Sequence, residues 1–192
     1  MDRISELNQI IERHGLNSHP FYQEWRMGTL PTEKLTDYAG EYGRFVATIA
    51  KGWDTIGMAH YAEEEREHEL LWNDFKAELG CTTLSQRPQT EVLVSAADNL
   101  FATPAEAVGA LYAFEAQQPH TSRSKLDGLN EHYNMSEKAK HYFVVHADDV
   151  HEVEDLAEKV NAMSDEEFSR CKTACTIVSA AMWSALDGVY YG

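Results

Sequence analysis

The apolar residues of this chain recur at intervals of three and four along most of its length, the spacing that places side chains on one face of an α-helix. No stretch alternates apolar and polar residues for long enough to predict a β-strand. Five prolines and eleven glycines lie mainly between the periodic segments, as expected for helices joined by short loops. We therefore expect an all-α bundle. A chain of 192 residues is long enough for one domain, 1–192, with a substantial core, and short for two.

The residues that interrupt the pattern give approximate helix bounds. Ser164, followed by Glu167, predicts a capping box at the start of the last helix, and Pro119 predicts a bend in the helix that begins at Pro104. Between residues 80 and 90 we expect a loop that contains Pro88. The expected helices cover 4–13, 20–27, 32–58, 59–79, 91–100, 104–126, a segment from Ser136 through the histidine-rich stretch 141–155, and 165–186.

Charge and cysteine content restrict the partners and the compartment. The formal net charge of −16 argues against nucleic acid or an anionic membrane as a partner, because both repel an acidic protein. No secretory signal and no apolar run of transmembrane length is present. The three cysteines, Cys81, Cys171 and Cys175, are odd in number and form no C-x-x-C pair. We therefore expect a reducing, cytoplasmic location.

Residues 141–155 combine imidazole and carboxylate side chains at helical spacing. His146 and Asp149, one turn apart, would project from the same side of a helix. Histidine with aspartate or glutamate is the ligand mixture that suits iron or manganese, and no cysteine competes nearby. On its own, this stretch fits an amphipathic helix with a solvated acidic face at least as well.

Two further helices carry matching ligand types on faces that otherwise look buried. Glu65 and His68 share one helix face, and Glu64 is an equal geometric rival to Glu65. Glu115 is surrounded in the sequence by apolar residues. A carboxylate buried among such residues usually loses its charge, forms an ion pair or binds a metal. Helical bundles build carboxylate-bridged di-iron sites from such groups converging on the core. With His146, these residues predict a metal centre.

Several motifs resemble a known superfamily. They are HPFYQEW at 19–25, HELLW at 68–72, GALYAFEAQQP at 109–119, KLDGL at 125–129 and YFVVHADDV at 142–150. The chain is similar here to the heme-oxygenase-like superfamily that includes TenA, PqqC and the di-iron oxidases, and most of all to its CADD-like para-aminobenzoate synthases. This resemblance implies a TenA-like helical bundle of about seven helices.

The resemblance also implies metal ligands. His68, Glu115 and His146 match the family pattern position for position. The chain lacks about four helical turns between the second and third ligand-bearing helices, so the acid that precedes His68 is not uniquely assigned among residues 63–65. We take Glu65.

The third ligand helix departs from the family motif H-x3-D-x2-H. Asp149 stands three residues after His146 and His151 stands five after it. On a regular helix Asp149 would face the same way as His146, with Glu152 as a further ligand candidate on that side, and His151 would point away. A bulge between residues 148 and 150 would swing His151 inward. We expect that bulge, with both Asp149 and His151 as ligands.

The CADD-like enzymes make para-aminobenzoate by consuming one of their own tyrosines, with a lysine as nitrogen donor. The matching positions are Tyr22, Tyr38 and Lys125, which the resemblance implies as catalytic residues, and another tyrosine of that pocket is replaced by Phe114. Tyr22 and Tyr38 also fit a generic aromatic core.

Together these features predict a non-heme iron oxidase or oxygenase that binds two iron ions, with manganese as a possible substitute. It would use O2 on a small organic acid, an amino acid or its own side chain, and we expect a homodimer. The rival hypothesis is a metal-free TenA- or PqqC-like enzyme, or a small-molecule binding protein, whose acids serve as salt-bridge partners. The sequence identifies neither the substrate nor the electron donor.

Overall fold

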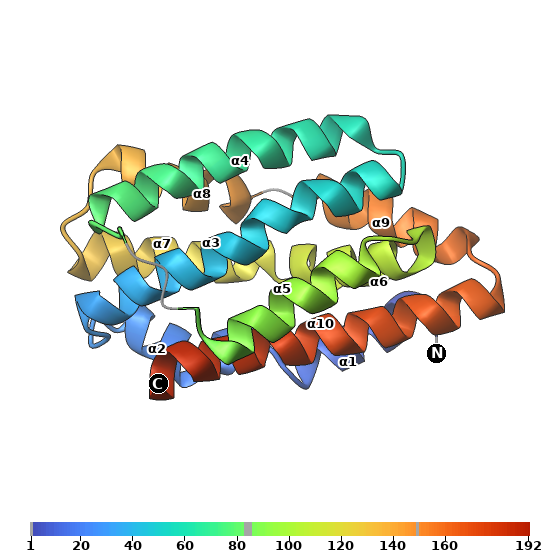
Figure 1. The fold of residues 1–192 in the computed structure, drawn as a ribbon, viewed down its shortest axis with the longest axis horizontal. Coiled ribbons are helices and arrows are strands. Elements are labelled where there is room, and N and C mark those ends of the chain that lie inside the picture. The colour runs from blue at the N-terminus through green and yellow to red at the C-terminus, as the bar shows by residue number, and fades with distance from the viewer. Residues whose placement is uncertain (1, 83–85, 149) are drawn as a thin grey trace.

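The computed structural model describes residues 2–82, 86–148 and 150–192, and these ranges contain helices and no strands. The all-α prediction is therefore confirmed for the described residues. In chain order the helices are α1 (Arg3–Glu12), the 3-10 helix η1 (Leu16–Ser18), α2 (Pro20–Arg26), α3 (Thr32–Thr55), α4 (Ala59–Glu78), α5 (Pro88–Leu100), α6 (Pro104–Glu115), α7 (Gln118–His132), α8 (Glu137–Ala147), α9 (His151–Ala162) and α10 (Asp165–Tyr191) (Figure 1).

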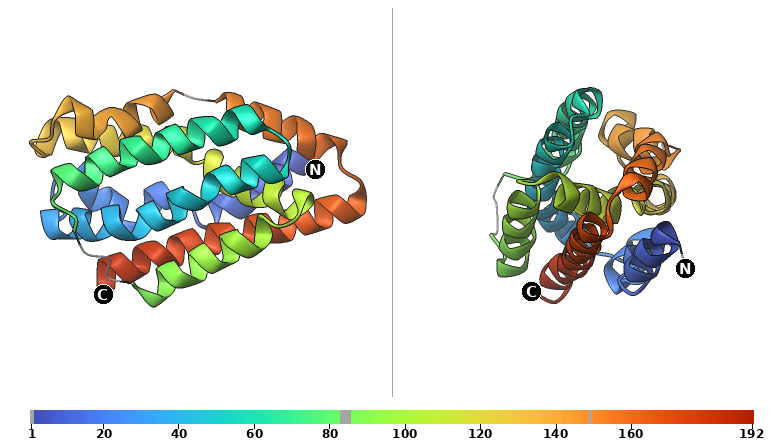
Figure 2. Two further views of the ribbon diagram at one scale, coloured as in Figure 1. Left: turned by 45° about the horizontal axis from the view of Figure 1, so that its top comes forward. Right: turned by 90° about the vertical axis from the view of Figure 1, so that its right-hand side faces the viewer.

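Helix α6 is the central helix of the bundle. Every residue from 107 to 115 is buried, because the segment is apolar on all sides and a helix of that kind is stable only when it is surrounded. The long helices α3 and α10 pack against it, and α9 covers a third side. The end-on view of Figure 2 shows the other helices grouped around this position. Any polar side chain between residues 107 and 115 is consequently held in the core.

Two of the expected helices are each divided in two, which is the main reason why the described chain has ten α-helices rather than about seven. The predicted bend near Pro119 is a break: α6 ends at Glu115, and α7 begins at Gln118 with Pro119 in its first turn. The histidine-rich helix ends at Ala147 and a new helix starts at His151 (Figure 2, left). Both breaks lie beside residues that the sequence marked as metal ligands.

The helix ends otherwise follow the local sequence signals. Ser164 and Glu167 form the predicted capping box, and the hydroxyl of Ser136 accepts a hydrogen bond from the Ala139 amide at the start of α8. Pro88 begins α5 instead of lying in a loop, because proline at the first position of a helix removes only an amide that would be unpaired there.

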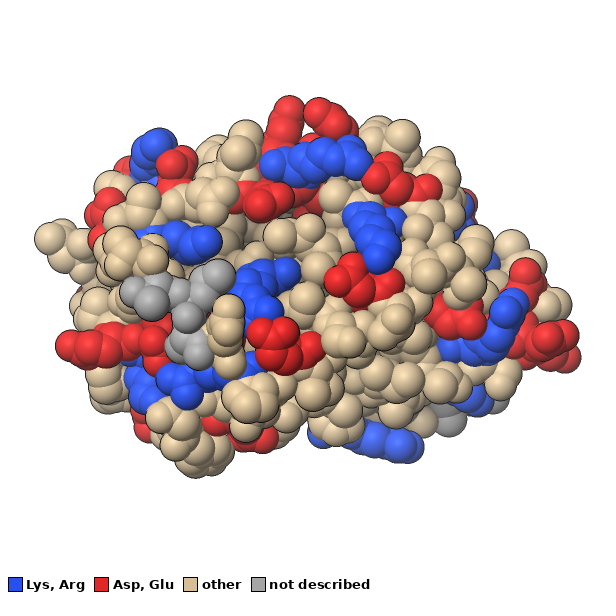
Figure 3. Space-filling view, in the orientation of Figure 1, with Lys and Arg blue, Asp and Glu red and all other residues tan. Residues whose placement is uncertain are grey.

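The outer surface is mixed in charge despite the large negative total. On the face shown in Figure 3, basic side chains lie among the acidic ones. Elsewhere in the described chain, opposite charges form ion pairs such as Lys51 with Asp98, at 2.8 Å. Among the described residues, no helix is long and apolar enough to cross a membrane.

The crossing of α6 and α10 gives a first prediction. A Cβ atom at Gly109 would overlap the backbone of Cys171. We expect Gly109→Ala to lower the free energy of unfolding by about 2 kcal/mol or more, because neither backbone can move away without separating the two helices. Chemical denaturation of Gly109→Ala and of Gly15→Ala would check this. Gly15 is the matched control, because its Cβ would meet only an ordinary contact of 3.5 Å. Equal losses in the two variants would contradict the prediction.

Candidate metal centre

Four helices bring acids and imidazoles together around the carboxyl end of α6. Glu65 and His68 come from α4, Glu115 is the last residue of α6, His146 lies near the end of α8, and Glu152 lies in the first turn of α9. These residues fall into two groups that share Glu65: one with both histidines, and one with Glu115 and Glu152. In each group the potential ligand atoms lie within 4.8 Å of one another.

Burial selects Glu65 from the run of acids on α4. Its side chain is 1% exposed, whereas Glu63 and Glu64 face solvent. The three consecutive acids differ in helical phase by about a hundred degrees each, so only one of them can face the core. The structure therefore places the acid chosen from the sequence beside the other candidate ligands.

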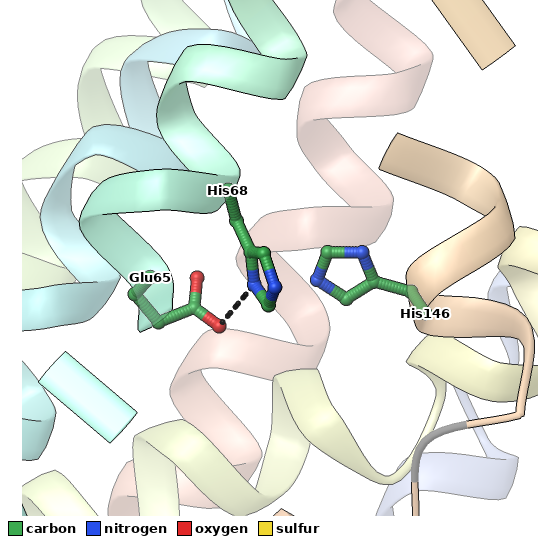
Figure 4. A group of neighbouring side chains, drawn as sticks. All are labelled: Glu65, His68 and His146. Carbon is green, nitrogen blue, oxygen red and sulfur yellow. Dashed lines mark hydrogen bonds and ion pairs between the residues drawn. The ribbon is translucent and has the colours of Figure 1, made fainter. Parts of the chain in front are cut away.

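The histidine group has the geometry of two imidazoles converging on one carboxylate (Figure 4). Nδ1 of His68 lies 3.3 Å from a carboxylate oxygen of Glu65, and the ring centroids of His68 and His146 are 4.4 Å apart. Two histidines and one carboxylate are a common set for non-heme iron.

His146 is held as a neutral imidazole that presents one nitrogen to the group. Its Nδ1 lies 2.7 Å from the carbonyl oxygen of Tyr142, so Nδ1 carries the proton and Nε2 keeps its lone pair. Burial, with the nearby His68, lowers the pKa of His146 to about 3. A backbone carbonyl on the second nitrogen is the usual support of a metal-binding histidine.

The second set of potential ligands, Glu65, Glu115 and Glu152, places three acids in the core. Burial, with the charges of Glu152 and Glu65, raises the pKa of Glu115 well above its usual value. All three side chains are at most 4% exposed. Like charges this close favour protonation of at least one acid in the absence of a cation.

The residues present fit a metal ion. Within the described part of the chain, both carboxylate oxygens of Glu115, one of Glu65 and Nε2 of His146 are buried without a hydrogen-bond partner. Unpaired buried groups of this kind are costly, and a divalent ion would satisfy them together. The donors are carboxylate oxygens and imidazole nitrogens, which suit iron or manganese.

The two remaining predicted ligands are Asp149 and His151. Asp149 lies outside the described residues. His151 is the exposed first residue of α9 and belongs to neither group, while the next residue, Glu152, is buried. We expected a bulge within one helix, but the helix ends at Ala147 and a new helix begins at His151. In this new helix the buried side chain is Glu152 and not His151. Glu152 had a weak sequence signal, because it continues the face of Asp149 on a regular helix.

The structure also brings Tyr22, Tyr38 and Lys125 together, all of them buried. The two phenolic oxygens are 2.7 Å apart, and Nζ of Lys125 lies 4.5 Å from the centroid of the Tyr22 ring. Among the described residues Nζ has no hydrogen-bond partner. Burial lowers the pKa of Lys125 to about 7, so a large share of this amine is neutral at physiological pH.

Aromatic rings connect this cluster to the carboxylates. Tyr42 stacks on Tyr38 with centroids 4.9 Å apart, and it lies near enough to Glu115 and Glu65 for their charges to raise its pKa further, after burial. Phe114, where the resemblance implies a tyrosine, packs edge-on against Phe45 and lies 6.5 Å from the Tyr42 ring. One phenol of the expected pocket is therefore replaced by an apolar ring.

Residues 42–185 match the model of a family described as iron-containing redox enzymes. The chain belongs to this family. It is accordingly an oxidoreductase, and the matched segment contains every candidate metal ligand.

Individual relatives agree with this placement. The chain is 28% identical to a 4-aminobenzoate synthase of Nitrosomonas europaea, with 96% of this chain and 89% of the relative covered. It is 25% identical to a 4-aminobenzoate synthase of Chlamydia muridarum, with 97% and 89% covered. Among solved structures, a TenA homologue from Pseudomonas syringae pv. tomato matches with a TM-score of 0.77 at 17% identity, with 99% of this chain and 91% of that one covered. The last match establishes the TenA-like fold.

The burial of Glu115 gives the second prediction. We expect Glu115→Gln to lose at least half of the iron bound per chain, because a neutral amide is a poor bridging ligand. Without metal, the free energy of unfolding of the same variant at pH 7 should be about 1 kcal/mol or more higher than that of the unmodified protein, because the glutamine does not have to take up a proton on folding.

This gain should depend on pH. The folded pKa of Glu115 is raised, so its contribution to stability is present at pH values below the ordinary pKa and is lost as the pH rises through the folded pKa. The advantage of the variant therefore grows from pH 4 to pH 8. Metal analysis and denaturation of Glu115→Gln and of the exposed control Glu64→Gln check both effects. Full iron loading in Glu115→Gln would place the metal elsewhere.

Proposed function

We propose that this oxidoreductase uses O2 at a two-iron centre held by Glu65, His68, Glu115, His146 and Glu152 to convert its own Tyr22 into 4-aminobenzoate. The observation that carries the proposal is the buried, unpaired amine of Lys125 above the Tyr22 ring, close to the two ligand groups. The activity named for the relatives from Nitrosomonas europaea and Chlamydia muridarum supports it. Asp149 and His151 remain predicted ligands from the sequence, and the homodimer also remains a prediction.

The metal would supply the activation of O2 and the oxidising power. The chain's own residues do the rest. Glu65 belongs to both ligand groups, so it would help to hold both ions. Tyr42 stacks on Tyr38, and Tyr38 meets Tyr22 edge-on with centroids 5.9 Å apart. Oxidation could reach Tyr22 through these rings without direct contact between Tyr22 and a metal. The burial of the whole cluster excludes water from the oxidised ring.

Tyr38 and Lys125 prepare Tyr22 for reaction. The hydroxyl of Tyr38 shares a hydrogen bond with the Tyr22 hydroxyl and provides a local partner for the phenolic proton. Lys125 offers a neutral amine, activated by desolvation, at the face of the ring that would receive nitrogen. Its positive form also acts on His146, whose pKa it helps to lower.

A second candidate function is the oxidation of an external organic acid. A surface pocket of about 220 Å³ reaches Tyr22 and is lined by Arg26 and Arg123, among others. Guanidinium groups at its mouth suit a carboxylate. The rival hypothesis of a metal-free TenA- or PqqC-like enzyme or binding protein is less well supported, because salt-bridge partners for the buried carboxylate oxygens of Glu115 are absent among the described residues.

Isotope labelling tests the proposal. Protein made with ring-labelled tyrosine and unlabelled medium, loaded with ferrous iron and exposed to O2 and a reductant, should release labelled 4-aminobenzoate, at most one molecule per chain. Tyr22→Phe should release none, and Tyr112→Phe, which removes a buried phenol bonded to Asn8, should be unaffected. Labelled product from Tyr22→Phe would identify another source, and oxidation of an added organic acid with no labelled product would favour the second candidate.

The Lys125 amine gives a pH prediction. Because burial lowers the pKa of this lysine from its usual 10.5 to about 7, the neutral, nucleophilic fraction increases as the pH rises through 7. The single-turnover rate of 4-aminobenzoate formation should therefore rise about tenfold between pH 6 and pH 8 and level off above, since each pH unit below a pKa costs a factor of ten. Lys125→Arg, which keeps its charge, should form no product at any pH. A flat profile would remove Lys125 from this role.

A further inference from the structure

A second set of aromatic rings leads from the three buried acids, Glu65, Glu115 and Glu152, to the surface. In space, Trp53 on α3 lies next to Tyr61 on α4. Together the two rings connect the region of Glu115 with Asp155 on α9. We propose that Trp53 and Tyr61 relay single electrons to the metal centre from a one-electron reductant at the surface, with Asp155 as the proton acceptor for Tyr61. This inference rests on the proposed function, because it requires a centre that becomes oxidising with O2.

The inner end of the relay lies near Glu115, in the core of the bundle. Trp53 is fully buried, and its indole N–H lies close enough to the Glu115 carboxyl to oppose the rise of its pKa. Because Glu115 shares a group of ligand atoms within 4.8 Å with Glu65 and Glu152, the indole is next to the place where the metal would sit.

The outer end of the relay is Tyr61, which lies next to Trp53 and close to the surface. The ring centroids of Trp53 and Tyr61 are 4.6 Å apart, close enough for direct ring contact. The Tyr61 hydroxyl donates a hydrogen bond of 3.0 Å to Asp155. Tyr61 is 8% exposed, and the ring of the exposed His60 lies tilted against it with centroids 4.0 Å apart. An external reductant could therefore approach the last ring without entering the core.

The hydrogen bond to Asp155 makes Tyr61 suitable for reversible oxidation. Trp53 gives one electron to the oxidised centre and takes one from Tyr61, whose phenolic proton moves to the Asp155 carboxylate. The surface reductant then returns one electron to Tyr61, and the proton returns from Asp155. In total the centre gains one electron and the reductant loses one, while Trp53, Tyr61 and Asp155 end unchanged.

The relay differs from the inner set of rings in its destination. Tyr42 and Tyr38 lead to Tyr22 and Lys125, which the proposed reaction consumes. Once Tyr22 has been used, an oxidised centre has no partner in that direction. The path through Trp53 and Tyr61 then provides the exit, and it would protect the remaining buried side chains from oxidation.

Electron paramagnetic resonance on the metal-loaded protein tests the relay. The parent protein carries Tyr22→Phe, so the inner reaction is silent. After ferrous protein is mixed with O2 and frozen within a second, we expect a tyrosyl radical signal, and ferric absorption reports the iron reaction in the same samples. Adding Tyr61→Phe should reduce the radical signal at least tenfold at equal iron content. Trp53→Phe and Asp155→Asn should each reduce it severalfold, and Tyr112→Phe is the matched control that should leave it unchanged.

The outcomes separate the relay from the proposed function. If ferric iron forms and the radical signal persists in Tyr61→Phe, or none forms in the parent, the relay is wrong while the metal centre stands. If no ferric iron forms on mixing the unmodified protein with O2, both proposals are wrong. Because Asp155 is only half-buried, Asp155→Asn tests the proton step even if Trp53→Phe does not fold.

Discussion

The structure depends on the burial of Glu115 at the end of a helix that is otherwise apolar on every side. A carboxylate in that position is expensive to desolvate, and the surrounding helices respond by supplying groups that share its need for a cation. Glu65, His146 and Glu152 each come from a different helix, so α4, α6, α8 and α9 each contribute a ligand-type side chain to the same region. The apolar packing determines where the helices lie, and the acids determine what must lie between them.

Most of the fold follows from local signals that act over a few residues. Helical periodicity, the Ser164–Glu167 capping box and the Pro104 helix start are all properties of short segments, and the structure agrees with them. The resemblance to the family predicted His68, Glu115 and His146 as ligands, and the structure places all three in the two groups of potential ligand atoms. The choice of Glu65 among neighbouring acids needed the rotation of α4, which the structure supplies. The burial of Glu152 beside an exposed His151 could not be predicted from the sequence, because periodicity does not reveal that a helix stops and restarts.

Two sets of aromatic rings start near the same carboxylates, and the residues at their far ends differ in chemistry. The set that includes Tyr42 and Tyr38 ends at a buried phenol beside an amine, where an oxidised ring can form a new bond. The set that includes Trp53 and Tyr61 ends at a carboxylate near solvent, where an oxidised ring can only be restored. The TenA homologues share the fold at 15–17% identity, and fold alone does not decide chemistry. In this chain the side chains around the acids carry the functional argument.

The break between α8 and α9 has an electrostatic consequence. A continuous helix would have placed residue 152 in its interior, where the backbone dipoles give no net charge. Because α9 starts afresh at His151, Glu152 lies in its first turn, close to unpaired amide groups that carry a partial positive charge. The restart therefore gives the acidic group a fixed positive neighbour that involves no basic side chain. A lysine or arginine in that position would neutralise the carboxylates and compete with a metal, whereas a helix end favours their charge without placing a cationic side chain among them.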